Sequence, residues 1–139
     1  MSIKLSLKQI HSQFARFGWL FLGVFYAATF LFILVLAYTG NLPEFLQHIP
    51  HYDTIGHFIL YSIATYLGHR LLQCRQLTLF SYKLPLWPVL FATFTITEEL
   101  IQQTSPNRTF SWLDMIMSIL GILFGTWLAE REYNKKANK

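Results

Sequence analysis

Six side chains able to exchange protons or hold a charged ligand lie between residues 53 and 114: Asp53, His57, Glu99, Gln102, Arg108 and Asp114. Carboxylates and imidazole exchange protons and attract cations, whereas a guanidinium attracts anions. These residues lie inside or beside apolar segments of the chain. A charged group at membrane depth is costly and usually faces other helices or a wet cavity. The six residues are therefore the candidate ligand-binding or proton-exchanging site, with no catalytic role assigned to any of them.

The composition is typical of an integral membrane protein. The chain has 139 residues, of which 53% are hydrophobic and 13% charged, and its formal net charge is +4. This length predicts a single domain over residues 1–139. The basic residues form no stripe with interleaved aromatic side chains, so we expect no nucleic-acid partner. A single cysteine, Cys74, excludes an intrachain disulfide and a multi-cysteine metal site.

The positions of the apolar segments predict four transmembrane helices, at about 17–38, 53–72, 86–103 and 112–129. The first contains no charged residue, and its length of about 33 Å is enough to cross the hydrocarbon core. Residues 1–16 carry apolar side chains every three or four positions, which predicts a short amphipathic helix on the membrane surface. Pro43 and Pro50 bound a second such helix in the first external loop. The predicted fold class is all-α, an integral membrane four-helix bundle with these two short amphipathic helices.

The remaining segments are predicted to be irregular. Residues 73–85 are predicted to form a polar connection that ends at Pro85. Residues 104–111 are predicted to form a tight loop. The polar tail from Glu130 to Lys139 is expected to fray.

Polar and small residues repeat at helical spacing in three predicted spans. The second span has Asp53, His57, Tyr61, Ala64 and Gly68. The third has Ala92, Thr95, Glu99 and Gln102, and the fourth has Asp114, Ser118, Gly121 and Gly125. Residues three or four apart share a helix face, so each set lines one face. On the fourth span, Ser118, Gly121 and Gly125 predict a surface for close helix packing. Glu98 lies about 100° around the helix from Glu99 and is expected to turn aside.

The basic residues predict the orientation of the chain in the membrane. Ten of the eleven Lys and Arg residues fall on one predicted side, and only Arg108 falls on the other. The positive-inside rule makes the basic side cytoplasmic and places both termini there. The charged ends of spans two, three and four then meet at the outer side.

These spacings resemble those of the VanZ-like family of small four-helix membrane proteins, over roughly residues 53–125. The matching positions are Asp53, His57, Tyr61, Glu99, Gln102, Arg108, Asp114, Gly121 and Gly125. Two positions depart from the family pattern: Thr54 stands where Lys is usual, and Ser118 where Asn is usual. The resemblance implies a multi-pass protein of the bacterial inner membrane with a link to the cell envelope and to tolerance of glycopeptide antibiotics. The family has no established enzymatic mechanism, so whether the protein is an enzyme stays open.

The charges of the candidate site do not balance. Asp53, Glu99 and Asp114 oppose a single certain cation, Arg108. One carboxyl group is therefore protonated, or His57 is charged, or a cation such as an amine or a metal ion comes from outside. His48, His51, Asp53 and His57 have the side-chain types that bind zinc, but the first two lie in a loop bounded by prolines. We therefore expect no metal and no cofactor, and leave zinc near these histidines as an alternative.

The leading functional hypothesis is an outward-facing polar pocket that binds or processes an envelope or lipid-linked ligand, with the lipid bilayer as the other partner. In this hypothesis Arg108 holds an anionic head group, His57 and Glu99 exchange protons, and Asp53 and Asp114 orient them. A competing hypothesis is a non-catalytic scaffold or subunit whose polar cluster only locks the helices together, with both aspartates as helix caps. Proton-coupled transport is a third hypothesis. It is disfavoured because the inner half lacks ionisable residues.

Overall fold

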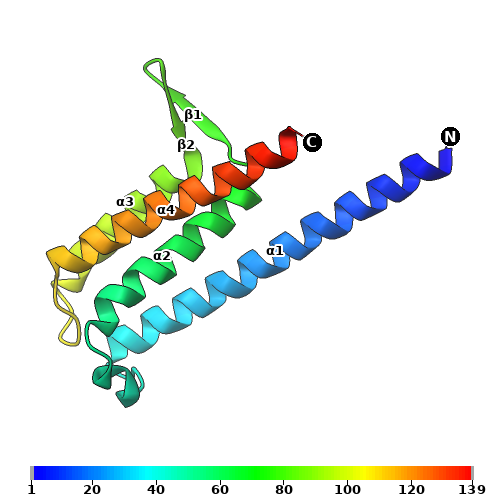
Figure 1. Ribbon diagram of the computed structural model, residues 1–139. Helices are drawn as coiled ribbons and strands as arrows, with labels where there is room; N and C mark the ends of the chain where they lie inside the picture. Colours follow the sequence, from blue (N-terminus) through cyan, green and yellow to red (C-terminus); the bar gives the residue numbers. More distant parts are fainter. Residues whose placement is uncertain (1, 139) are drawn as a thin grey trace.

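In the computed structural model the backbone is described for residues 2–138, and the side chains from Arg16 onward except that of Gln47. Within this range four long helices follow one another along the chain: α1 (Ser2–Thr39), α2 (Tyr52–Leu71), α3 (Leu86–Gln102) and α4 (Trp112–Ala137) (Figure 1). A short 3-10 helix, η1 (Glu44–His48), lies between α1 and α2. Two strands, β1 (Gln76–Leu79) and β2 (Tyr82–Pro85), form an antiparallel hairpin between α2 and α3.

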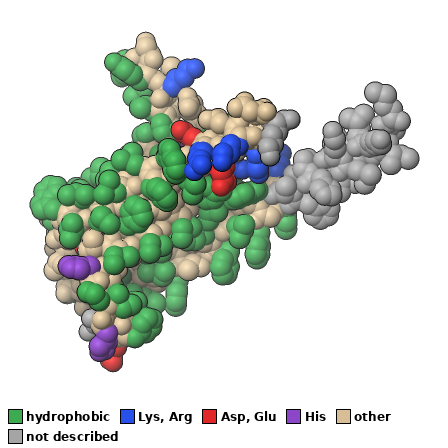
Figure 2. Space-filling model, in the orientation of Figure 1, with side chains coloured by type: hydrophobic (Ala, Val, Ile, Leu, Met, Phe, Trp, Pro, Cys, Tyr) green, Lys and Arg blue, Asp and Glu red, His purple; other side chains and the backbone are tan. Residues whose placement is uncertain are grey.

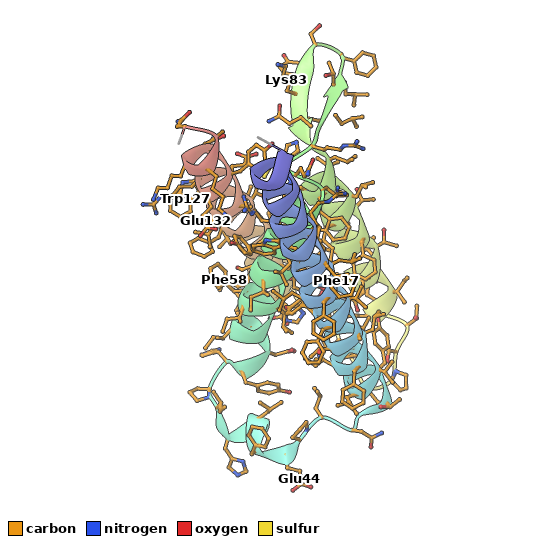
Figure 3. All side chains as sticks on the ribbon, turned by 90° about the vertical axis from the view of Figure 1, so that its right-hand side faces the viewer. Phe17, Glu44, Phe58, Lys83, Trp127 and Glu132 are labelled. Carbon is orange, nitrogen blue, oxygen red and sulfur yellow. The ribbon has the colours of Figure 1, made fainter. Side chains whose placement is uncertain are left out.

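The bundle has two chemically different ends. At one end lie the C-terminus of α1, the start of α2 and the loop that joins α3 to α4; at the other lie the hairpin and the C-terminus of the chain (Figure 1). Figure 3 shows Glu44 at the first end, and Lys83 and Glu132 at the opposite end. Lysine and arginine side chains gather near the C-terminus in the space-filling view (Figure 2).

The interior of the bundle is unusually polar. The largest fully buried side chains are all polar: His69, Gln102, Glu99, Thr65, Thr95 and Ser118. A smaller apolar cluster joins Tyr61, Ala64, Phe91 and Ile122. Large apolar side chains such as Phe21, Ile59 and Leu123 are exposed instead, and hydrophobic groups cover much of the face in Figure 2. Among the described residues, two helical segments are long and apolar enough to cross a membrane: Arg16–Thr39 and Trp112–Ala137.

Three sequence-based expectations about the fold are wrong. Residues 1–16 are not a separate surface helix, because α1 runs without a break from Ser2 to Thr39 and no proline interrupts it. The segment 73–85 contains the β-hairpin, whose turn residues Phe80 and Ser81 both have positive φ, as a two-residue hairpin turn requires. The tail does not fray at residue 130.

Helix α4 continues to Ala137, eight residues beyond the predicted end of the fourth span. Glu132 and Lys136 lie four residues apart on it, with the acid on the N-terminal side, which stabilises a helix. Lys135 and Lys136 occupy its last turn, where positive charge interacts favourably with the helix dipole.

Candidate functional site

The six predicted site residues all lie at the end of the bundle where α2 and α4 begin and α3 ends. His57, Glu99, Gln102 and Asp114 are buried, and Arg108 lies in the loop between α3 and α4. The side chain of Asp53 is 41% exposed, so the cluster reaches solvent at this residue.

Asp53 contacts two other residues of this set, Arg108 and His57. The Nη1 atom of Arg108 donates to both carboxylate oxygens of Asp53, at 3.3 and 3.4 Å. The Nδ1 atom of His57 lies 2.8 Å from the backbone oxygen of Asp53 and 3.6 Å from its Oδ1. A carbonyl oxygen only accepts hydrogen bonds, so this contact places a proton on Nδ1 and leaves Nε2 of a neutral ring as an acceptor.

A second group of contacts surrounds the start of α4. Oγ of Ser111 accepts a hydrogen bond from the backbone N–H of Asp114 and thereby caps the helix. The backbone N–H of Ser111 donates to Oε1 of Glu99 at 3.1 Å. The hydroxyl of Thr54 donates to Oδ1 of Asp114 at 2.8 Å. Ser111, rather than Asp114, is therefore the cap, and the carboxylate of Asp114 faces α2.

Glu98 turns away from Glu99, as helix geometry predicts, but it stays within the polar cluster. It is 6% exposed, and its carboxylate accepts hydrogen bonds from Nε2 of Gln102, at 3.0 and 2.9 Å, and from the hydroxyl of Tyr38, at 2.9 Å. The end of α1 covers Glu98 while the start of α4 covers Glu99, so both sides of α3 are occupied. Gln102 and Glu99 are both buried on α3, as the shared face predicts, but the amide of Gln102 donates to Glu98.

Three potential metal-ligating groups converge within this cluster. Asp53, His57 and Asp114 each offer one ligand atom, and these atoms all lie within 4.8 Å of one another. Thr54 orients the carboxylate of Asp114, and the carbonyl of Asp53 orients the ring of His57. Supporting hydrogen bonds of this kind are typical of the surroundings of metal ligands. The set consists of two carboxylates and an imidazole, which suits a divalent cation with further positions open to water or ligand.

The two loop histidines lie apart from this convergence. His48 and His51 are exposed, and His51 precedes α2 with a left-handed backbone, φ 55°. Among the described residues, the ligand atoms of Asp53 and His57 therefore converge with that of Asp114. They do not converge with the loop histidines that the sequence suggested as zinc ligands.

The predicted helix-packing residues lie on the face of α4 that contacts α2. A Cβ atom added to Gly121 would lie 2.6 Å from the backbone oxygen of Phe58, and one added to Gly125 would meet that of Ser62. Ser118 is fully buried on the same face. These small residues allow the two backbones to approach closely.

The sequence does not indicate a site role for three residues of the cluster: Tyr38, Thr54 and Ser111. Ser111 and Asp114 have the spacing of a helix N-cap and its third residue, a signal that is present in the sequence. Tyr38 is distant in sequence and lies in an apolar segment, so no local pattern identifies it.

No protein-family model, no curated protein and no solved structure matches the chain. The resemblance to the VanZ-like family stays a prediction that rests on the motif spacings.

Proposed function

We propose that this chain is a four-span protein of the bacterial inner membrane whose polar cluster binds a cationic ligand at the outer face. Both termini are cytoplasmic in this proposal. The distribution of side chains supports insertion of all four helices, because each of them exposes large apolar residues while polar groups fill the interior. The 20 residues of α2 extend about 30 Å and the 17 of α3 about 26 Å, close to the thickness of the hydrocarbon core.

One observation carries the functional part of the proposal, namely the excess of carboxylates in the cluster. Asp53, Glu98, Glu99 and Asp114 lie at the same end of the bundle, and among the described residues only Asp53 is paired with a guanidinium, that of Arg108. Three of the four are less than 9% exposed, and a buried carboxylate requires a counter-charge or a proton. A cation that enters beside the exposed side of Asp53 satisfies this requirement for Asp114, whose carboxylate converges with Asp53 and His57.

The ligand class is an amine-bearing envelope or lipid-linked molecule, or a divalent metal ion with the same positive charge. Asp53, His57 and Asp114 contact the cation, and Thr54 holds the carboxylate of Asp114 in place. Arg108 takes a different role from the one first expected. Because both oxygens of Asp53 accept from it, it offsets part of the charge of this carboxylate instead of holding an anionic head group.

Calorimetric titration of the detergent-solubilised protein tests the proposal. Zn²⁺ or Mn²⁺ alone forms one arm, and short-chain phosphatidylethanolamine, whose head group is an amine, forms the other. We expect one arm to bind and the Asp53→Asn and Asp114→Asn variants to bind at least about tenfold more weakly. Glu44→Gln is the matched control, because it removes an exposed acid from the same end of the bundle. No binding in either arm, or equal binding by all variants, contradicts the proposal.

A structural lock is the second candidate function, for a scaffold or non-catalytic subunit. It is favoured by the fact that each of the four carboxylates already has a hydrogen-bond partner within the protein. In this case the cluster fixes the register of the helices, and substitutions in it lower the stability without changing any binding.

A further inference from the structure

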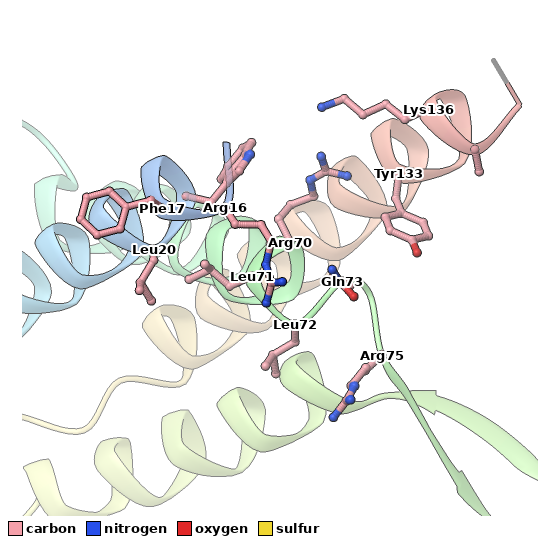
Figure 4. Close-up of a pocket in the computed structure, with 12 residues that line it drawn as sticks. Arg16, Phe17, Leu20, Arg70, Leu71, Leu72, Gln73, Arg75, Tyr133 and Lys136 are labelled. Atoms are coloured by element: carbon pink, nitrogen blue, oxygen red, sulfur yellow. The ribbon is translucent and has the colours of Figure 1, made fainter. Parts of the chain in front are cut away.

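A cavity of about 820 Å³ lies at the opposite end of the bundle from the polar cluster. Four cationic side chains line it: Arg16 of α1, Arg70 of α2, Arg75 after α2, and Lys136 of α4 (Figure 4). No acidic residue of the described chain is among its lining residues. The cavity is therefore strongly positive and open to an anion.

The nearby acids are already engaged elsewhere. Glu130 lies 3.4 Å from the buried ring of His69, and Glu132 accepts a hydrogen bond of 2.6 Å from the hydroxyl of Tyr66. Neither of them lines the cavity. The cationic groups around it thus keep their charge available for a ligand.

Arg70 is held in place by aromatic rings. Its guanidinium carbon lies 5.4 Å from the ring centre of Trp19 and 6.0 Å from that of Tyr133. Its Nε and Nη1 atoms are buried and have no hydrogen-bond partner among the described residues. Such unpaired donors are costly unless a ligand accepts from them, and a guanidinium matches the geometry of a phosphate group.

An apolar groove of about 560 Å³ adjoins this cavity. It lies between α1, α2 and α3, and its walls include Tyr26, Phe30 and Trp87. Leu71 and Leu72 line both the groove and the basic cavity, so the two spaces meet at the end of α2. A basic cavity that continues into an apolar groove has the shape and chemistry of a phospholipid.

We infer that the two spaces together form a binding site for an anionic phospholipid, with its phosphate on Arg70 and an acyl chain in the groove. Basic pockets between membrane helices on the cytoplasmic side bind anionic head groups in this way. A free phosphate would use the same cations, but it would leave the groove unexplained. The inference is independent of the ligand of the outer cluster.

Native mass spectrometry in detergent tests this inference with three probes: phosphatidylglycerol, phosphatidylcholine of the same acyl chains, and glycerol phosphate. The Arg75→Gln/Lys136→Gln double variant removes two exposed cations of the cavity and leaves the packed Arg70 intact. Arg131→Gln/Lys83→Gln is its matched control, because both residues carry charge at the same end, in α4 and β2, but lie outside the cavity.

We expect phosphatidylglycerol to bind more tightly than phosphatidylcholine, and its affinity to fall about fivefold for each cavity cation removed. The control pair should change it by less than about twofold. Equal affinity for both lipids, or equal losses in the two double variants, would overturn the inference. Competition by glycerol phosphate at the same concentration as the lipid would identify a free phosphate as the ligand and overturn the lipid assignment.

A second pair of variants tests the groove. Ala27→Trp fills it from α1, whereas Ala28→Trp adds the same side chain at an exposed position outside it. Only the first should weaken phosphatidylglycerol binding. Unchanged binding by Ala27→Trp would show that no acyl chain occupies the groove.

Discussion

The hydroxyl of Thr54 donates a 2.8 Å hydrogen bond to Oδ1 of Asp114 and so joins the first turn of α2 to the first turn of α4. A hydroxyl satisfies one lone pair of a carboxylate without neutralising its charge. The negative charge of Asp114 is therefore left for His57 or for a bound cation. A lysine at position 54 would instead supply that charge from within the protein.

Thr54→Lys is expected to abolish cation binding while the protein stays folded, because its ammonium group occupies the place of the ligand beside Asp114. The affinity for the bound cation should fall at least about tenfold. Thr54→Val is the matched control, since it keeps the shape and removes only the hydrogen bond, at a cost of about 1 kcal/mol in stability. Calorimetric titration of both variants with the cation measures this. Unchanged cation affinity of Thr54→Lys would show that Asp114 does not contact the bound cation.

The variant Arg108→Ala distinguishes the two hypotheses for the polar cluster, a binding site and a structural lock. The Arg108 side chain is 11% exposed but that of Asp53 is 41% exposed, so water can solvate the orphaned carboxylate. We expect a loss of less than about 2 kcal/mol in stability, nearer to a surface pair than to a buried one. Cation affinity should rise by up to about fivefold, because Arg108 no longer competes for Asp53. Thermal unfolding in detergent and titration measure the two effects; a loss of about 3–5 kcal/mol with no change in binding would support the lock.

Gly121→Ala and Gly125→Ala should each destabilise the bundle by about 1–3 kcal/mol, the usual range for overpacking. The added methyl group meets a backbone oxygen of α2, which cannot rotate away, so the two helices must separate. Gly56→Ala is the control, because nothing lies within 4 Å of its added Cβ. Thermal unfolding of the three variants checks this, and equal stability of all three would exclude close packing of α2 on α4.

Cys74 reports the orientation of the chain in the membrane. We expect no labelling of intact cells by a membrane-impermeant maleimide, and labelling once the membrane is opened, because Cys74 lies between α2 and β1, at the basic end. Glu44→Cys in a Cys74→Ser background, at the opposite end, should be labelled in intact cells. Burial raises the pKa of the Cys74 thiol, so after opening its labelling rate should rise about tenfold per pH unit between pH 7 and 8.5. Ready labelling of Cys74 in intact cells would reverse the orientation.

The helices were largely predictable from the sequence because their signals are local. Apolar segments and the prolines near α3 locate the helix ends within one or two residues for α2 and α3. The spacing of polar residues also predicts which helix ends carry charged groups. The hairpin was not predictable, because its turn places Phe80 and Ser81 at positive φ, where glycine or asparagine is the usual signal.

Within the site, the sequence identifies which residues are polar but not what they contact. Glu98 and Glu99 do point in different directions, as helix geometry requires, yet Tyr38 covers the first and Ser111 the second. Those neighbours come from distant parts of the chain, so no local spacing reveals them. In the sequence Arg70 indicates only the orientation of the chain, because its position beside two aromatic rings exists only in the folded bundle.

The polar interior has a consequence for the thermodynamics of this protein. Its largest fully buried side chains, such as His69 and Thr95, are polar, whereas many of its large apolar side chains are exposed. In the proposed bilayer setting, separation of the helices would thus uncover little apolar surface to water, and exposure of apolar surface is what gives unfolding its large heat capacity change. The heat capacity change should be small, and the stability curve correspondingly flat with temperature, without the loss of stability on cooling that hydrophobic cores show.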